Sequence, residues 1–128
     1  MKKAIVIGNG DLFQKPQIEE KAYIVAVDGG YKYIKQYRIK TDLVLGDFDS
    51  EDKKRVICKN IITLPVHKDD TDTSYAINYL IEKWYDEFEL YGMLGGNRFE
   101  HSLANIQVLA KIGKLGLNGK IYSSNSSY

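Results

Sequence analysis

Cysteine is nearly absent from this chain of 128 residues, which contains a single one, Cys58. One cysteine cannot form an internal disulfide, so the sequence excludes the disulfide-linked scaffolds typical of small secreted proteins. With only two histidines in the chain, a zinc site made of cysteine and histidine is disfavoured as well. Cys58 lies in a stretch with a helical pattern, where we expect a small buried apolar residue rather than a nucleophile.

An excess of charge and long hydrophobic runs are also missing. Lys and Arg total 18 against 17 for Asp and Glu, so the formal net charge of +1 gives no strong basic field for nucleic-acid phosphates. The apolar run at residues 4–7 is shorter than the roughly 7–15 residues of a signal peptide. No run approaches the roughly 18 apolar residues of a membrane span. We therefore expect a cytoplasmic protein that binds neither nucleic acid nor membranes.

Several sequence signatures of nucleotide and catalytic sites are missing too. The chain has no Gly-x-x-x-x-Gly-Lys-Ser/Thr phosphate loop, and Gly8-Asn9-Gly10 lacks the third glycine of the dinucleotide-binding fingerprint. It contains neither a Gly-x-Ser-x-Gly nucleophile elbow nor the protein-kinase motif set. Any nucleotide chemistry must therefore rest on other residues.

The composition is that of a globular domain, with 44% hydrophobic and 27% charged residues. Short apolar runs alternate with polar or glycine-rich loops and helical stretches. Strands are predicted at residues 4–7, 23–27, 43–45, 61–64 and 88–91, with a sixth candidate at 120–122, and helices at 17–21, 30–37, 52–59, 72–86 and 100–112. Most strand runs are continuously apolar, as strands covered on both faces require. The pattern predicts an α/β fold in which an open, mostly parallel sheet is flanked by helices in a Rossmann-like three-layer arrangement.

The helix predicted at 72–86 has the clearest pattern. Asp69, Thr71 and Asp72 supply capping oxygens and negative charge at its start. Its apolar residues recur at three- and four-residue spacing and form one stripe: Ala76, Ile77, Leu80, Ile81 and Trp84.

Glycines and carboxylates follow the predicted strands where each strand ends. Ligands bind to open parallel sheets at this carboxyl edge, so these residues are candidates for one site. The segments are Gly8-Asn9-Gly10, Asp28-Gly29-Gly30, Gly46-Asp47-Phe48-Asp49-Ser50, His67-Lys68-Asp69-Asp70-Thr71-Asp72, and residues 92–101.

Asp47 and Asp49 are two residues apart and face the same side of an extended segment. Such a carboxylate pair suits Mg²⁺, which takes a few carboxylates together with substrate phosphates. The alternative is a solvated turn that caps the next helix, and Asp69 and Asp72 carry the same ambiguity. Asp28 with its glycines is also a common turn signal. Each motif alone leaves both interpretations open, whereas their convergence on one edge favours an acidic site.

In this order and spacing, the segments around Asp28, Asp47, Asp69 and Arg98 resemble the motifs of the thiamine pyrophosphokinase family, over nearly the whole chain. The resemblance implies transfer of a pyrophosphoryl group from ATP to the thiamine hydroxyl with Mg²⁺, giving thiamine diphosphate and AMP. It also implies a homodimer when full length. Residues 1–122 would be the nucleotide- and Mg-binding catalytic domain, and 123–128 the start of a C-terminal region whose β-rich domain is missing here.

The resemblance assigns a role to individual residues. Asp47, Asp49 and Asp72 are expected to hold the metal and, with Arg98, to form the catalytic group. Substrate binding is expected at Glu100 and His101. The expected nucleotide-binding residues are Asp28, Gly29, Gly30, Ser50, Lys68, Asp69, Thr71, Gly95 and Gly96. The chain departs from the family pattern where Asn97 separates the glycine pair from Arg98 and where Glu100 replaces an aspartate.

Three other functions remain open from the residues. One is a pyrophosphokinase acting on a pterin or another hydroxymethyl heterocycle, because the acidic groups are expected to recognise the nucleotide more than the acceptor. Another is a metal-dependent phosphohydrolase, in which the carboxylates activate water. The last is a nucleotide-binding module without catalysis.

Overall fold

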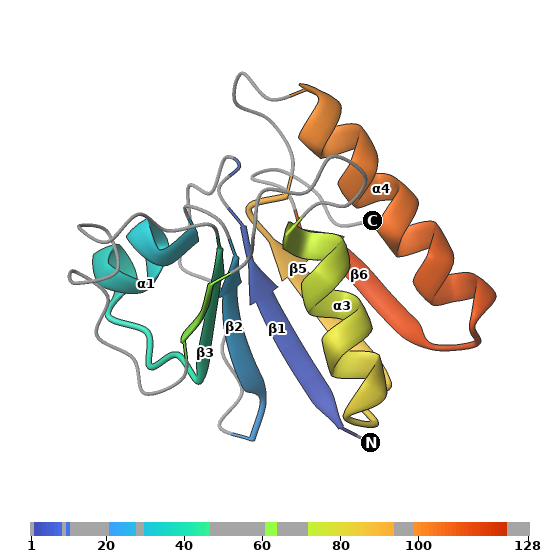
Figure 1. Cartoon of the computed structure of the whole chain (residues 1–128), viewed down its shortest axis with the longest axis horizontal. Coiled ribbons are helices and arrows are strands. Elements are labelled where there is room, and N and C mark those ends of the chain that lie inside the picture. Colours follow the sequence, from blue (N-terminus) through green and yellow to red (C-terminus); the bar gives the residue numbers. More distant parts are fainter. Residues whose placement is uncertain are drawn as a thin grey trace.

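The computed structural model describes residues 2–8, 10, 21–27, 30–46, 61–63, 72–93 and 99–122, with the backbone alone for residues 46, 61–63, 72 and 99–105. Within these residues, a six-stranded sheet has the order β4-β3-β2-β1-β5-β6, and its neighbouring strands are parallel (Figure 1). The strands are β1 (Lys3–Ile7), β2 (Tyr23–Val27), β3 (Leu43–Gly46), β4 (Ile61–Thr63), β5 (Glu87–Tyr91) and β6 (Asn118–Tyr122). The helices are α1 (Tyr31–Tyr37), α3 (Asp72–Glu82) and α4 (Phe99–Lys114).

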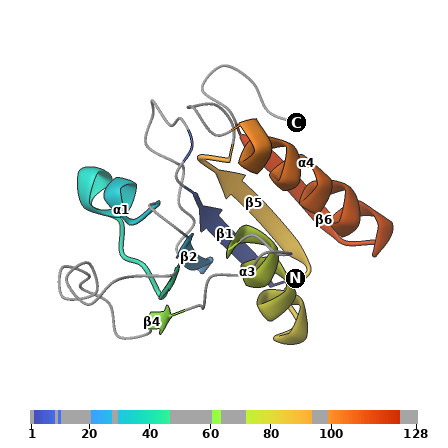
Figure 2. The same ribbon diagram turned by 45° about the horizontal axis from the view of Figure 1, so that its top comes forward.

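Helices lie on both faces of the sheet, α3 and α4 on one and α1 on the other (Figure 2). The central strand β1 shows why its sequence is continuously apolar. Ala4 and Val6 belong to the core beneath α3 and α4, while Ile5 and Ile7 belong to the core beneath α1, and all four are fully buried. The predicted α/β fold with a three-layer arrangement is confirmed.

Strand β5, which lies between β1 and the edge strand β6, departs from this pattern. Phe88 and Leu90 are buried on the α3–α4 side, whereas Glu89 lies on the opposite face and forms an ion pair with Lys3 at 2.6 Å. Lys120 of β6 is the register partner of Glu89. The apolar residues of α1 share a core with β1, β2 and β3, and Tyr91 of β5 and Tyr122 of β6 pack at its carboxyl end. The rest of the β5–β6 half of that face carries polar side chains.

Each described helix ends in the same hydrogen-bonded turn. The residue after the last turn adopts a left-handed backbone, at Arg38 (φ 54), Trp84 (φ 71) and Gly116 (φ 75). The next amide then bonds to a carbonyl five residues earlier, which defines a Schellman motif. These bonds join Ile39 to Ile34 at 3.0 Å, Tyr85 to Leu80 at 3.1 Å and Leu117 to Ile112 at 3.1 Å.

The prediction of a helix over 72–86 is wrong at its C-terminal end. Helix α3 ends at Glu82, and Trp84 is 83% exposed instead of continuing the apolar stripe. Ala76, Ile77 and Leu80 of that stripe are buried as expected. The cause is the left-handed turn at Trp84, which ends the helix so that the chain can enter β5.

The remaining predicted elements are accounted for as follows. The predicted helices at 30–37 and 100–112 correspond to α1 and α4. The helix predicted at 52–59, with Cys58, lies outside the described residues, and so do residues 123–128. Of the helix predicted at 17–21, only Lys21 is described, and it lies in a turn. None of the described helices is long and apolar enough to cross a membrane.

Trp84→Gly is expected to raise the free energy of unfolding by about 1 kcal/mol, because glycine adopts the left-handed backbone without the steric penalty of a side chain. The exposed Trp84 ring has little packing to lose. Urea denaturation of the variant measures the change. Glu82→Gly, at the last residue of the same helix, is the control and should lose up to about 1 kcal/mol. A Trp84→Gly variant less stable than the wild type would contradict the interpretation.

Candidate functional site

The carboxyl ends of the strands meet at one edge of the sheet, the upper edge in Figure 1. From β1 the chain builds the sheet outward through β2, β3 and β4, then returns to the other side of β1 to add β5 and β6. The order therefore reverses between β1 and β5. In open α/β sheets the ligand crevice lies outside the carboxyl ends at such a topological switch point.

At this switch point the backbones that leave β1 and β5 are in direct contact. Gly8 N–H donates to the Tyr91 carbonyl at 2.7 Å, and Gly10 N–H donates to the Gly92 carbonyl. A Cβ atom at Gly8 would lie 2.8 Å from the Gly92 carbonyl oxygen, too close for any side chain. Gly92 also has a positive φ of 66°, which favours glycine. The end of β1 and the end of β5 can come this close only because both residues are glycines.

Gly30, which is predicted to bind nucleotide, makes a third contact of this kind. It precedes α1 with helical backbone angles (φ −61, ψ −17). A Cβ atom there would collide with the carbonyl group of Ile7. The contact brings the start of α1 onto the end of β1, beside the switch point.

The first turn of α3 packs against the same place. Thr73 is buried, and its hydroxyl lies 3.8 Å from the sulfur of Met93. The Met93 sulfur would in turn be 3.1 Å from a Cβ atom at Gly8. Asp72, predicted to be catalytic, is the first residue of α3 and so begins this helix at the carboxyl edge.

Most of the predicted site residues lie outside the described residues. Gly30 is described in full, and for Asp72, Glu100 and His101 the backbone is described, the last two in the first turn of α4. In sequence, Asp28 directly follows β2 and Asp47 directly follows β3. The residues outside are Asp28, Gly29, Asp47, Asp49, Ser50, Lys68, Asp69, Thr71, Gly95, Gly96 and Arg98. The described elements thus bring the ends that carry these motifs to one edge.

Sequence reasoning missed Tyr33 as a residue of this site. Tyr33 lies in α1, is 8% exposed, and donates a hydrogen bond from its hydroxyl to the Gly10 carbonyl. The chain has ten tyrosines, and no local pattern separates this one from those that only pack. Among the described side chains, no group of three or more His, Cys, Asp or Glu could hold a metal ion.

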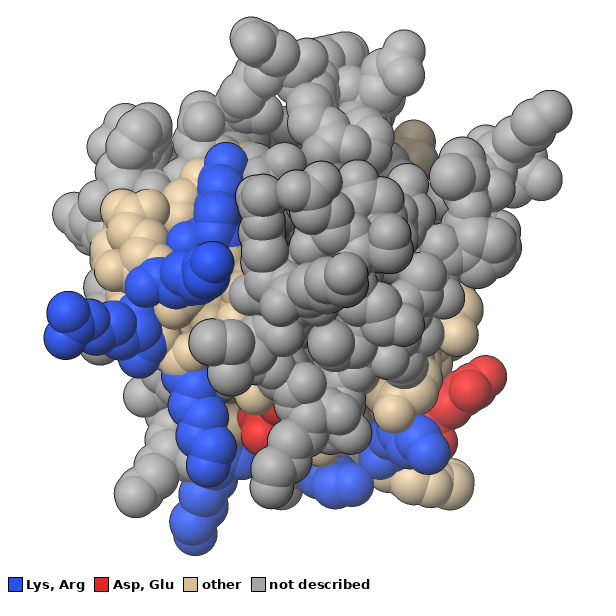
Figure 3. Space-filling model, turned by 60° about the vertical axis from the view of Figure 1, so that its left-hand side comes forward, with Lys and Arg blue, Asp and Glu red and all other residues tan. Residues whose placement is uncertain are grey.

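The surface over α1 is basic. Lys32, Lys35, Arg38 and Lys40 are all exposed, and Lys and Arg side chains gather on the face shown in Figure 3. None of these four forms an ion pair with another residue that the structure describes. Because α1 begins at the carboxyl edge, Lys32 in its first turn brings a positive charge to that edge.

A family model described as "Thiamin pyrophosphokinase, catalytic domain" matches residues 15–121 of the chain. A thiamine pyrophosphokinase of Bacillus subtilis (strain 168) is 36% identical over 98 residues. The match covers 73% of this chain and 45% of the Bacillus protein, so the chain spans about half the length of this relative.

Solved structures agree with the fold. The crystal structure of a thiamin pyrophosphokinase family protein from Enterococcus faecalis has a TM-score of 0.80 and 26% identity, covering 99% of this chain and 63% of that one. The Bacillus subtilis thiamine pyrophosphokinase structure has a TM-score of 0.76 and 23% identity, covering 94% of this chain and 60% of that one. At that identity the likeness shows the fold alone. The family resemblance found in the sequence is confirmed by the family model and by the Bacillus subtilis relative.

Proposed function

Because the chain belongs to the thiamin pyrophosphokinase catalytic-domain family, we propose that it carries the nucleotide-binding part of a thiamine diphosphokinase. The reaction is attack of the thiamine hydroxyl oxygen on the β-phosphorus of ATP, with AMP as the leaving group. The observation that supports this best is the family match over residues 15–121, which contains the acidic and glycine motifs that follow β2, β3, β4 and β5.

The donor set fits Mg²⁺ as the metal. Asp47, Asp49 and Asp72 offer hard carboxylate oxygens, and Mg²⁺ prefers a few such ligands together with phosphate oxygens. Asp47 follows β3 in sequence and Asp72 begins α3, so both attach to elements at the carboxyl edge. When bound, the metal would neutralise negative charge on the polyphosphate.

The other residues would bind and orient the substrates. Transfer of a phosphoryl group needs in-line positioning and charge neutralisation more than covalent help from the protein. Lys68 and Arg98 would bind phosphate oxygens. Glu100 and His101, which lie in the first turn of α4, would bind the acceptor. Asp28, Gly29, Gly30, Ser50, Asp69, Thr71, Gly95 and Gly96 complete the proposed nucleotide site.

The label position after turnover tests the proposed reaction. The full-length protein incubated with Mg²⁺, thiamine and ATP labelled at the β-phosphate should place the label in thiamine diphosphate and release an equal amount of AMP. Label in ADP would contradict the proposal. Label in free phosphate or pyrophosphate without acceptor would favour the phosphohydrolase, and turnover only with a hydroxymethyl pterin would favour that acceptor.

The proposal includes a cytoplasmic homodimer for the full-length protein. Its support is the family resemblance alone. Light scattering coupled to size-exclusion chromatography would measure the mass of the assembly, and a monomer at micromolar concentration would contradict the dimer.

A further inference from the structure

We propose that Tyr33 is a positioning residue of the nucleotide site. By holding the carbonyl of Gly10, it fixes the backbone that leaves β1 against the end of β5. The inference rests on the proposed function for the ligand, and on the hydrogen bonds around Gly10 for the geometry. Tyr33 acts through the backbone and need not touch the substrate.

Both polar backbone groups of Gly10 are held by other elements. Its N–H donates to the Gly92 carbonyl after β5, and its carbonyl accepts the Tyr33 hydroxyl from α1. Gly10 lies beyond the register of β1, whose last paired residue is Ile7. The hydrogen bond from Tyr33 therefore anchors a residue that sheet pairing does not reach.

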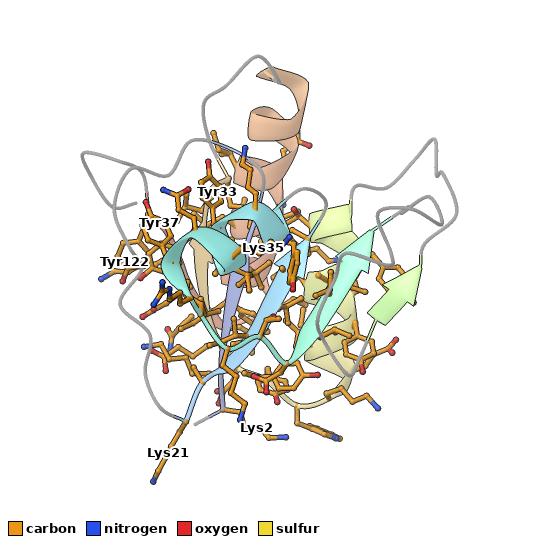
Figure 4. The ribbon with its side chains drawn as sticks, turned by 90° about the vertical axis from the view of Figure 1, so that its left-hand side faces the viewer. Lys2, Lys21, Tyr33, Lys35, Tyr37 and Tyr122 are labelled. Atoms are coloured by element: carbon orange, nitrogen blue, oxygen red, sulfur yellow. The ribbon has the colours of Figure 1, made fainter. Side chains whose placement is uncertain are left out.

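The Tyr33 hydroxyl is itself held in place. Its ring is 8% exposed in the core beneath α1 and stacks on Tyr37 with centroids 6.4 Å apart. The Lys32 ammonium lies 4.9 Å from the centre of the ring. Figure 4 shows Tyr33 and Tyr37 on the same helix. Because Gly30 has no side chain, the start of this helix packs directly against β1. Because ring and helix are both packed, the hydroxyl is presented at a defined point.

The hydrogen bond from Tyr33 to Gly10 matters because the backbone contacts at the switch point are made by glycines. Gly8, Gly10 and Gly92 lack the side chains that restrict backbone angles, so they gain the most conformational freedom when a contact is lost. A ligand that binds there must order any backbone that is free, and this ordering lowers its affinity. The Tyr33 hydrogen bond removes that cost in advance.

Tyr33→Phe tests the inference, because it keeps the ring and deletes the hydroxyl. We expect the Gly10 amide to exchange with solvent about tenfold faster, while the amides of Val6 and Leu90 in the core are unchanged. The dissociation constant for Mg–ATP, measured by calorimetry, should rise about fivefold. Tyr85→Phe removes a hydroxyl at the opposite edge of the sheet and is the matched control, for which neither quantity should change.

Each other outcome is decisive. Unchanged exchange at Gly10, or unchanged Mg–ATP affinity in Tyr33→Phe, overturns the inference. A Tyr33→Phe chain that unfolds also overturns it, because the hydroxyl would then support the whole fold instead of the site. A wild-type chain that binds no Mg–ATP contradicts the proposed function, and Gly10 exchange alone then decides whether Tyr33 positions this backbone.

Discussion

Alanine in place of Gly92 is expected to lower the free energy of unfolding by about 3–5 kcal/mol, because it combines two penalties. The positive φ of 66° disfavours any side chain, and the new Cβ atom would lie 2.5 Å from the Gly8 carbonyl oxygen. Relief of that contact requires the ends of β1 and β5 to separate. The variant therefore also tests whether the switch point depends on their direct contact.

Alanine substitutions at three other glycines measure the two penalties separately. Gly30→Ala has the collision with Ile7 at an ordinary φ and should lose about 1–3 kcal/mol. Gly116→Ala has a positive φ of 75° with nothing within 4 Å and should lose about 1–2 kcal/mol. Gly113→Ala has neither penalty and should gain about 0.5–1 kcal/mol as a helical residue.

Urea denaturation followed by circular dichroism measures the change in the free energy of unfolding for all four variants on one scale. If Gly92→Ala costs no more than Gly116→Ala, the contact with Gly8 contributes nothing and the strand ends are not held by it.

Asp47→Asn or Asp49→Asn is expected to abolish Mg²⁺-dependent ATP binding and to leave the fold nearly intact. Each substitution removes a carboxylate from the proposed metal site, and if these carboxylates lie together as proposed, the loss of one charge relieves repulsion in the absence of metal. Calorimetric titration of Mg–ATP into each variant measures the affinity, and thermal unfolding measures the fold.

The control for this experiment is Glu82→Gln, which makes the same change in net charge at an exposed residue at the end of α3. It should bind Mg–ATP like the wild type. Unchanged affinity in both aspartate variants would contradict the metal assignment. An unfolded variant would favour the alternative in which these aspartates cap a helix.

The strands, and the burial of most of them on both faces, could be predicted because they are local properties of the sequence. The predicted strand at 23–27 coincides with β2, since a strand covered on both faces is a continuous apolar run between polar segments. The end of α3 could not be predicted, because the residue that adopts the left-handed backbone is Trp84 and not the glycine that normally marks a helix end.

The edge that carries the site was predictable, whereas its internal contacts were not. Motifs placed after parallel strands must lie at the same edge, and Asp28 and Asp47 directly follow β2 and β3. The contacts of Gly8 with Gly92 and of Gly10 with Tyr33 join residues far apart in sequence. Periodicity and propensity describe neighbours along the chain, so they contain no information about these pairs.

The central place of β1 has a consequence for synthesis of the protein on the ribosome. One side of β1 is occupied by β5, through pairs from Lys3 with Glu87 to Ile7 with Tyr91. While only the first 86 residues have been made, that side of β1 has no partner and is a template for pairing with other nascent chains. The contact between Gly8 and Gly92 forms only after β5 is complete, so substrate cannot stabilise any earlier intermediate through it. Pairing of β1 with β2 occupies the opposite side of β1, so neither that pairing nor the ligand protects the β5 side of β1 until β5 has been made.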